Sequence, residues 1–557
     1  MLLDHIEIVG FRGINRLSIN VRELTAFLGE NSWGKSSLFD ALSLFLSGTN
    51  KLNKLTLDDF HIPPLKGATR QRSIQIVFTF KEQYRGESFQ RQFKSIRDAW
   101  SDMHEGIRYI YLQIEGEITD LGNVKTKRYF LNSTGNEKNF NHETLSDLVS
   151  EFISFVPVLR MGQSCSMDQT VAITEQATAS KRSHFETRIQ KIFTRLTASS
   201  QQLSEHDLHQ GYEAVAYLFD NYLFKKYDGF DYYKTDFKQD IRSQRPFSFD
   251  GISHFYDLLK TGNKKDRAML LLILGEFLKV RGDHLLRRGA SPILLLDEPE
   301  TGLHPVNLAI TWRFLSLLPM QKLVITNSSL LISFFPLSRI QRLVRHPDLI
   351  KSYHLKPKLY SNNDLRRIAF HLRMNRPHSL FARAWLLVEG ETETWLLTEL
   401  ARLYGHNLAI EGIQIIEFAQ CGLAPLIKLA QDLNIEWHVL TDGDSAGQKY
   451  AQRVENSLLE GDPLANRLTI LPAQDIEHFF YNNGFQHVYL KAANYTEKDL
   501  FHLTSQKVIN KAVHKHSKPW LGLSIASAIE EQGTKTIPPL LKRLFSRLVG
   551  LARSQSG

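Results

Sequence analysis

The feature that most constrains this chain is an eight-residue loop near its start. Residues 29–36 read Gly-Glu-Asn-Ser-Trp-Gly-Lys-Ser and match the phosphate-binding pattern GxxxxGK[ST] in full. An apolar run at residues 24–28 predicts a strand before the loop, and the apolar periodicity of residues 36–46 predicts a helix after it. This context lets backbone N–H groups and a helix N-terminus surround phosphates. The loop therefore predicts a nucleotide-binding α/β domain.

The residues of this loop have separate expected roles. Lys35 is expected to reach the β- and γ-phosphates of ATP, and the Ser36 hydroxyl is expected to hold Mg²⁺. The other candidate nucleotide-binding residues of the loop are Gly29, Glu30, Asn31, Ser32, Trp33, Gly34 and Ser37.

A second motif places two acids at the end of a buried strand. Residues 293–299 read Ile-Leu-Leu-Leu-Asp-Glu-Pro. At the carboxyl end of such a strand, Asp297 can hold Mg²⁺ through water and Glu298 can polarise the attacking water. The simpler alternative is an acidic pair that caps a strand. Lys35 and Asp297 are 262 positions apart, so a long segment is inserted between the two halves of this site.

Two further sequence segments resemble those of a known protein family. Residues 297–305, Asp-Glu-Pro-Glu-Thr-Gly-Leu-His-Pro, resemble the ABC-type ATPases of the SMC, RecF and OLD kind. Residues 8–13, Ile-Val-Gly-Phe-Arg-Gly, resemble the first strand of these ATPases, where Arg12 would lie near the nucleotide. The resemblance implies that two heads close over ATP, with each head supplying a signature loop to the other.

Two positions depart from that family pattern. Residues 259–264 are the best candidate for the signature loop, but Lys260 replaces the serine that would contact the γ-phosphate. In residues 323–328, Leu-Val-Ile-Thr-Asn-Ser, Asn327 stands where the family has a switch histidine. Asparagine can form hydrogen bonds but cannot carry a positive charge. We therefore expect ATP hydrolysis to be slow or to act as a switch.

A second group of carboxylates follows two later strands. Residues 386–393 read Leu-Leu-Val-Glu-Gly-Glu-Thr-Glu, and residues 436–447 read Glu-Trp-His-Val-Leu-Thr-Asp-Gly-Asp-Ser-Ala-Gly. Acids that follow parallel strands converge at the carboxyl edge of the sheet, and hard Mg²⁺ or Mn²⁺ ions prefer such oxygen ligands. The candidate metal ligands are Glu389, Glu393, Asp442 and Asp444.

This second pattern resembles the Toprim domain, and an ABC-type head followed by Toprim resembles the layout of the OLD (overcoming lysogenization defect) family, in particular its YbjD-like group. The resemblance implies that Glu389 also acts in acid/base chemistry and that Lys518 is an active-site lysine. It also implies that Glu477, in the acidic motif Asp475-Ile-Glu477-His478, is a further metal ligand, with His478 in a structural role. The simpler alternatives are a surface helix that begins at the acidic motif, and a lysine that is one of several in this region.

The expected fold class is α/β, with an ABC-type ATPase head that carries a helical insertion, then a Toprim domain and a helical C-terminal part. The expected limits are residues 1–375, 380–480 and 481–557, with the seam near residue 378 after a basic segment interrupted by proline. The insertion at residues 165–250 is our candidate for the dimer contact.

Composition narrows the class of protein. The net charge of +9 and the pI of about 9.2 permit a polyanionic partner without requiring one. Cys165 and Cys421 form no CxxC pair, which excludes a zinc site built on cysteines and fits a reducing cytosol. The longest apolar stretch, residues 268–274, is far shorter than the ~20 residues of a membrane helix. We therefore expect a cytoplasmic protein without a membrane segment.

Two functions remain open at this point. The first is an endonuclease that binds and hydrolyses ATP and cleaves DNA with two Mg²⁺ or Mn²⁺ ions, acts as a homodimer in DNA repair, recombination or phage defence, and has an unidentified helicase or defence protein as a partner. The second is an ATP-gated clamp or repair mediator resembling RecF, in which Toprim only binds. The intact carboxylate set favours the first, because a binding surface has no need for clustered acids beside DNA phosphates.

Overall fold

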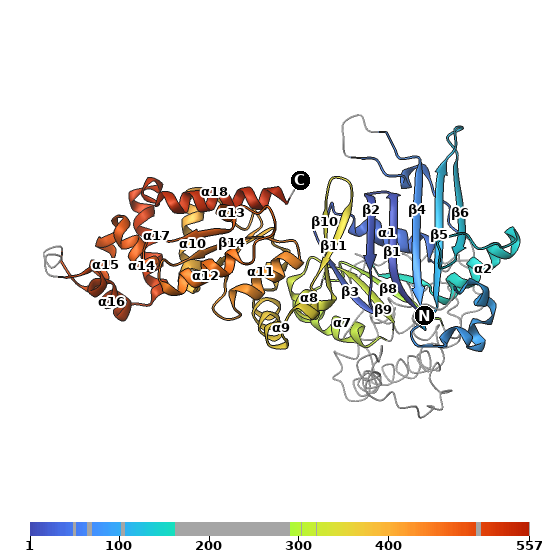
Figure 1. The fold of residues 1–557 in the computed structure, drawn as a ribbon, viewed down its shortest axis with the longest axis horizontal. Coiled ribbons are helices and arrows are strands. Elements are labelled where there is room, and N and C mark those ends of the chain that lie inside the picture. Colours follow the sequence, from blue (N-terminus) through green and yellow to red (C-terminus); the bar gives the residue numbers. More distant parts are fainter. Residues whose placement is uncertain are drawn as a thin grey trace, which may run out of the picture. The chain divides into compact units, whose positions relative to one another are not determined.

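The computed structural model (Figure 1) describes residues 1–47, 52–63, 69–101, 106–161, 290–301, 303–318, 320–496 and 503–555. The chain divides into two compact units, residues 1–335 with 339–352 and residues 336–338 with 353–557. The candidate dimer contact at 165–250 and the candidate signature loop at 259–264 lie outside the described residues. Among the described helices, none has the length and apolar character needed to cross a bilayer.

The first unit is built on an 11-stranded sheet with the order β6-β5-β4-β1-β2-β11-β10-β3-β9-β8-β7. Its strands are β1 (Leu2–Phe11), β2 (Ile14–Asn20), β3 (Leu24–Leu28), β4 (Ser73–Lys81), β5 (Tyr109–Ile118), β6 (Val124–Leu131), β7 (Val158–Met161), β8 (Ile293–Asp297), β9 (Gln321–Ile325), β10 (Ile340–Arg345) and β11 (Ile350–His354). Its helices are α1 (Lys35–Phe45), α2 (His142–Phe155), α7 (Pro305–Leu317) and α8 (Ser329–Ser333).

The two halves of this sheet differ in strand direction. β1 pairs antiparallel with β2 and β4, whereas β3, β9, β8 and β7 pair parallel to one another. All five residues of β9 and the first four of β8 are buried, which is the pattern of strands covered on both faces. β9 lies between β3 and β8, so the carboxyl ends of β3 and β8 reach the same edge. This topology brings the phosphate-binding loop and Asp297 together.

The second unit has a four-stranded parallel sheet with the order β13-β12-β14-β15. Its strands are β12 (Ala384–Val388), β13 (Ile413–Glu417), β14 (Glu436–Thr441) and β15 (Leu468–Ile470). Its helices are α9 (Asn362–Ile368), α10 (Glu391–Tyr404), α11 (Leu423–Asp432), α12 (Ser445–Glu455), α13 (Leu464–Arg467), α14 (Ile476–Phe480), α15 (Gln486–Ala493), α16 (Ser505–Lys515), α17 (Lys518–Gln532) and α18 (Pro539–Ser554). Short 3-10 or π turns occur at Leu57–Asp59, Glu87–Phe89, Arg91–Ala99, Leu337–Arg339, Pro357–Leu359, Ala369–Asn375, Pro377–Phe381, Tyr481–Phe485 and Thr534–Thr536.

The segment that leads into β12 packs on the second unit. The carboxylate of Asp432, at the end of α11, accepts hydrogen bonds from the Tyr360 hydroxyl at 2.8 Å and from the Lys356 backbone N–H at 3.1 Å. Arg376 forms an ion pair with Glu417 at the end of β13. The domain limits 1–375, 380–480 and 481–557 stay a prediction.

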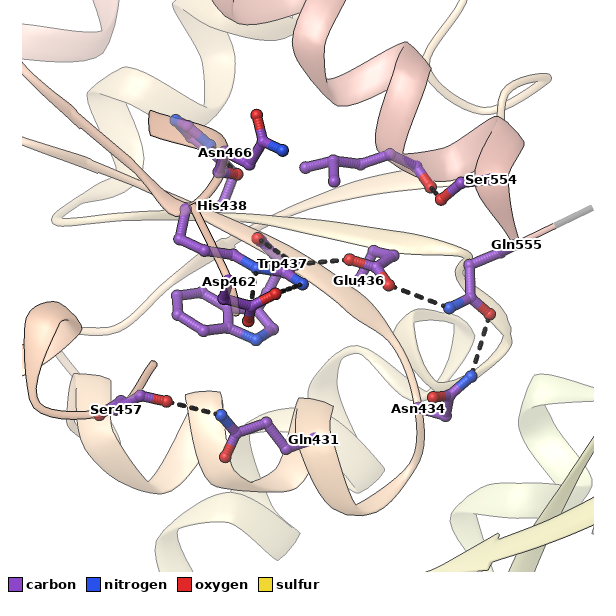
Figure 2. A network of polar contacts seen from close by, with 12 residues as sticks. Gln431, Asn434, Glu436, Trp437, His438, Ser457, Asp462, Asn466, Ser554 and Gln555 are labelled. Atoms are coloured by element: carbon purple, nitrogen blue, oxygen red, sulfur yellow. Dashed lines mark hydrogen bonds and ion pairs between the residues drawn. The ribbon is translucent and has the colours of Figure 1, made fainter. Parts of the chain in front are cut away.

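The amino edge of the second sheet is closed by a polar network (Figure 2). Glu436, the first residue of β14, pairs with the guanidinium of Arg467 and accepts a hydrogen bond from Nε2 of Gln555 at 3.2 Å. Gln555 follows α18 and in turn accepts a hydrogen bond from Nδ2 of Asn434 at 3.3 Å. Arg467 also pairs with Asp462 at 3.2 Å. The network fastens the end of α18 to the sheet and gives each of its acids a charged or amide partner.

Candidate functional site

The phosphate-binding loop joins β3 to α1, in the strand–loop–helix context that the sequence predicts. Gly29 and Gly34 have positive φ angles of 145° and 81°, which glycine adopts without steric cost. A Cβ atom on Gly29 would lie 2.7 Å from the carbonyl oxygen of Leu343, and one on Gly34 would lie 2.5 Å from Cδ1 of Ile350. Both glycines are therefore required by the backbone angle and by close packing.

The remaining loop residues are held by the strands around them. The exposed or half-buried members are Glu30, Asn31, Ser32, Ser36 and Ser37, whereas Trp33 is buried. Arg345, at the end of β10, donates hydrogen bonds to the carbonyl oxygens of Ser32 at 3.0 Å and Gly13 at 3.1 Å. The N–H of Gly13 donates to the Ser37 hydroxyl at 3.2 Å. These contacts fasten the loop to the turn that follows Arg12.

Lys35 is buried at the centre of the loop, with 2% of its surface exposed. Its ammonium group donates hydrogen bonds to the carbonyl oxygen of Gly29 and, at 3.1 Å, to Oδ1 of Asn327. Burial lowers the pKa of Lys35 from its usual range, while the negative charges of Glu298 and the neighbouring acids oppose that shift. A phosphate placed in the loop would give this cation stronger acceptors than an amide and a carbonyl.

A chain of ion pairs connects Arg12 to the acidic strand. Arg12 pairs with Asp59 at 3.0 Å and with Asp40 of α1 at 2.6 Å. Asp40 also pairs with Arg160 of β7 at 2.5 Å, and the guanidinium of Arg160 reaches Asp297. The structure thus links the two residues that the resemblance placed near the nucleotide. Arg160 was not predicted as a site residue. It lies in a short apolar strand far from both motifs, and nothing else in the sequence marks it.

Asn327, which the sequence presents as a departure from the family pattern, joins the two halves of this site. Its Nδ2 donates to Oε1 of Glu298 at 2.7 Å, and its Oδ1 accepts from Lys35. Glu298 itself has a positive φ of 49°, an uncommon angle for a residue with a side chain. Glu300, another residue that sequence analysis missed, accepts from the Thr326 hydroxyl at 2.9 Å and from the Asn327 backbone N–H at 2.7 Å.

The second candidate site lies at the carboxyl edge of the four-stranded sheet. β12 and β14 are parallel neighbours, and Leu387 is paired with Val439 in their register. Glu389 directly follows β12 and Asp442 directly follows β14, so the two residues leave adjacent strands within one residue of the same level. Glu393 lies in the first turn of α10 and is buried, with 8% of its surface exposed.

Two glycines fix the turn between β14 and α12. A Cβ atom on Gly443 would lie 2.4 Å from the carbonyl oxygen of Ala473, and one on Gly447 would lie 2.0 Å from that of Asp442. Asp444 is the N-cap of α12, and its Oδ1 accepts a hydrogen bond from the Gly447 N–H at 2.7 Å. One oxygen of this candidate ligand is therefore already used by the helix.

The acids at this edge raise one another's pKa. Burial and the charges of Glu393 and Glu389 raise the pKa of Asp442 to about 8. Burial and Asp444 raise the pKa of Glu389, and burial with Glu477 raises that of Glu393. Carboxylates raise one another's pKa in this way where they share a poorly solvated region. The structure thus brings the candidate ligands into one electrostatic cluster.

Glu477 and Lys518 complete this cluster from two helices. Glu477 is buried in α14, and Nζ of Lys518, the first residue of α17, lies 3.0 Å from its Oε1. Burial acts to lower the pKa of Lys518, but the acids around it outweigh that effect and raise the pKa. Asp475 caps α14 and holds His478, whose Nδ1 lies 2.6 Å from its carboxylate. His478 therefore makes a structural contact with the residue that caps its own helix.

Tyr489 of α15 is a neighbour of this cluster that sequence analysis missed. Its side chain is fully buried, and its hydroxyl has no hydrogen-bond partner among the described residues. Burial and the charges of Glu477 and Asp475 raise its pKa. A lone tyrosine between motifs carries no signal in the sequence that would reveal this position.

The residues at this edge fit a hard divalent cation. The donors are carboxylate oxygens, they repel one another, and Oε2 of Glu389 is buried without a hydrogen-bond partner among the described residues. As the side chains stand, no three His, Cys, Asp or Glu groups in the described parts of the chain are arranged to hold a metal ion. To hold a cation together, Glu389, Glu393 and Asp442 would have to come closer to one another than they now stand.

A pH-dependent stability follows from the raised pKa of Asp442. A carboxyl group whose pKa is about 8 in the folded state and near 4 when unfolded destabilises the fold progressively as pH rises from 4 to 8. In metal-free buffer we expect Asp442→Asn to melt several degrees above the wild type at pH 8, with the difference vanishing near pH 4. Thermal unfolding in EDTA between these values measures the effect. An equal difference at all pH values would contradict it.

Comparisons with known proteins decide the family of this chain. Residues 1–379 match the family described as "Protein of unknown function (DUF2813)", and residues 380–444 match the Toprim domain described as "Overcoming lysogenization defect protein-like". Over 563 residues the chain is 39% identical to "Uncharacterized protein YbjD" of Escherichia coli (strain K12), with 100% of each chain covered. The chain belongs to the OLD family. The predicted YbjD-like group is confirmed as well.

The OLD-family chain has the predicted α/β fold class, with a P-loop head on a mixed sheet followed by a Toprim domain and a helical C-terminal part. Two solved structures show partial likeness. The C-terminal region of the Burkholderia pseudomallei OLD protein is 18% identical, covering 31% of this chain and 99% of that one with a TM-score of 0.27. The SMC head domain from Thermotoga maritima is 14% identical, covering 64% and 100% with a TM-score of 0.30.

Proposed function

We propose that this OLD-family chain is a nuclease that cleaves DNA phosphodiester bonds at the carboxyl edge of the Toprim sheet and that binds and hydrolyses ATP in its head. The observation that carries the proposal is the set of mutually repelling carboxylates at that edge. Glu389, Glu393 and Asp442 all have a raised pKa there. Like charges held together lower the stability of the fold, and carboxylates with raised pKa values concentrate at catalytic and metal-binding sites.

The opposite edge of the same sheet provides the contrast. There Glu436 is paired with Arg467 and accepts a hydrogen bond from Gln555 (Figure 2). The two edges belong to one small sheet and differ in the state of their acids. This difference favours a nuclease over the RecF-like clamp, because a binding surface for DNA phosphates is weakened by clustered negative charge.

The roles of the chain's own residues follow from their places. Glu389, Glu393, Asp442 and Asp444 would hold Mg²⁺ or Mn²⁺, with Glu477 as an outer ligand oriented by Lys518. When bound, such an ion supplies a Lewis acid and a water of lowered pKa beside the phosphate. Glu389, whose raised pKa favours keeping a proton, can give or accept one at Oε2, which has no hydrogen-bond partner within the described parts of the chain. Lys518 can offer positive charge to a phosphate from the surface side.

The ATP site of the head has matching candidate roles. Lys35 and the backbone of the loop would bind the phosphates, Ser36 and Asp297 would hold Mg²⁺, and Glu298 would orient the attacking water. Arg12, which the ion-pair chain connects to Asp297, would contact the nucleotide. The assignments of the loop residues, Asp297 and Glu298 rest on their motifs together with the common edge of β3 and β8, whereas that of Arg12 rests on the resemblance and on its ion pairs.

Metal-dependent cleavage is the direct test of the nuclease. We expect purified protein to nick supercoiled plasmid in Mg²⁺ or Mn²⁺ and to lose this activity in EDTA. Supercoiled, linear and single-stranded DNA should all be tried, together with RNA, because the site itself does not distinguish the sugar. Absence of metal-stimulated cleavage of every substrate would leave the ATP-gated clamp in its place. DNA as the partner and the cytoplasm as the location stay predictions.

We also propose that two copies pair, as the ABC-type head implies. Light scattering with and without ATP should show a dimer, and Glu298→Gln, which retains ATP, should shift the population toward it. A monomer at every concentration under both conditions would contradict the pairing.

A further inference from the structure

An acid-free, basic stretch borders the carboxylate cluster. Residues 503–529 contain no Asp or Glu; their basic residues are Lys507, Lys511, His514, Lys515, His516 and Lys518. The stretch forms α16 and most of α17. In α16 the buried residues are Val508, Ile509 and Ala512, whereas Lys507, His514 and Lys515 are exposed. One face of the helix is therefore packed, and the other presents positive charge.

An aromatic plane lies where α16 meets α17. The rings of His516 and Trp520 are stacked with centroids 4.0 Å apart and an interplanar angle of 16°. Trp520 remains 45% exposed despite this contact. Its backbone is fixed, because the hydroxyl of Ser517 caps α17 by accepting the Trp520 N–H at 3.4 Å. The indole is thus a preformed, partly open surface for stacking.

The same two helices are fastened to the acidic edge. Lys518, two residues before Trp520, lies 3.0 Å from Glu477. At the other end, Nε2 of His478 lies 2.9 Å from Oε1 of Gln506 in α16. Figure 1 shows α14, α16 and α17 gathered at one end of the second unit. Lys518 and Trp520 both lie in the first turn of α17, so a ligand stacked on Trp520 would lie within one helical turn of the lysine that contacts the cluster.

We propose that this surface binds a single-stranded segment of nucleic acid, with an unpaired base stacked on Trp520 and the backbone phosphates along the basic face of α16. The inference rests on the proposed nuclease function and specifies its substrate. Positive charge interleaved with an exposed aromatic ring is the combination that holds single strands without reading their sequence. In a duplex the base faces already stack on one another, so a duplex would meet the lysines but not the ring.

Binding without cleavage isolates this surface from the catalytic site. In EDTA, a fluorescent oligothymidine should bind wild type, and Trp520→Ala should weaken that binding about tenfold. Trp520→Phe, which keeps an aromatic face, should recover most of the affinity. Trp395→Ala is the matched control, since Trp395 is 46% exposed on α10 and lies outside the acid-free stretch. The control should bind within about twofold of wild type.

A duplex of the same length separates stacking from charge. We expect its affinity to be unchanged in Trp520→Ala and reduced in Lys515→Ala, whose binding should also depend less steeply on salt. Quenching of tryptophan fluorescence by the oligothymidine gives a second readout, which Trp520→Phe should diminish without unfolding the protein.

The outcomes distinguish this inference from the proposed function. Equal binding of the oligothymidine by wild type and Trp520→Ala, or an equal loss in Trp395→Ala, overturns the inference even if cleavage is observed. If only Trp520→Ala loses oligothymidine binding and the protein cleaves no nucleic acid, the single-strand-binding surface is supported and the nuclease function is rejected.

Discussion

Asp442→Ala should reduce metal-dependent cleavage of DNA by about 100-fold or more, because it removes a charged ligand from a shared site. Glu389→Ala should do the same, since Glu389 contributes both an oxygen ligand and a group that can hold a proton. Initial rates of plasmid nicking in Mn²⁺ and Mg²⁺ measure the loss. Neither substitution should unfold the protein, because both residues follow strands and lie at the sheet edge.

A matched control lies on the same helix as one of the candidate ligands. Glu391 is an exposed acid in the first turn of α10, two residues before Glu393. Glu391→Gln removes an acid from this region without touching the cluster, and its cleavage rate should stay within about twofold of wild type. Identical rates for Asp442→Ala and wild type would reject the nuclease assignment and leave the clamp.

Glu298→Gln should bind ATP but turn it over about 100-fold more slowly than wild type, because the amide cannot polarise the attacking water. Lys35→Ala should instead lose affinity for the nucleotide, because the buried ammonium group is the expected phosphate ligand. Binding of a fluorescent ATP analogue and release of phosphate separate the two effects. Equal hydrolysis rates in wild type and Glu298→Gln would reject the role given to Glu298.

Lys35→Ala also tests whether the ATPase and nuclease activities are separable. The ATP site and the carboxylate cluster belong to different compact units. Lys35→Ala should therefore keep part of its basal cleavage activity. Complete loss of cleavage in Lys35→Ala, with Tm unchanged, would show that ATP is obligatory for the nuclease.

The fold and the centre of each site could be predicted because their signals are local. A glycine-rich loop between a strand and a helix is readable wherever it occurs, and so is an acid at the end of an apolar strand. Asp297, Glu389 and Asp442 all stand at such strand ends. Parallel strands then bring these residues to one edge without further information from the sequence.

The partners that surround these residues could not be predicted, because they come from distant positions and carry no motif. Arg160 reaches Asp297 across 137 positions, and Tyr489 lies near Glu477 through the packing of helices. Asp444 shows a different limit. The sequence marks it as a ligand, but the structure also uses one of its oxygens to cap α12, a competition between roles that spacing does not reveal.

The side-chain amide of Asn327 competes with the phosphates of ATP for the ammonium group of Lys35. Two of the three N–H donors of Lys35 are given to Gly29 and to Oδ1 of Asn327, so a phosphate that needs the donor held by Asn327 must displace that oxygen, and the apparent affinity for ATP then scales with the fraction of time that this donor is free. Displacement also disturbs the hydrogen bond from the same amide to Glu298. Engagement of Lys35 by Asn327 would then raise the apparent dissociation constant for ATP while leaving the binding curve hyperbolic, and removal of that amide would tighten ATP binding before any phosphate is transferred.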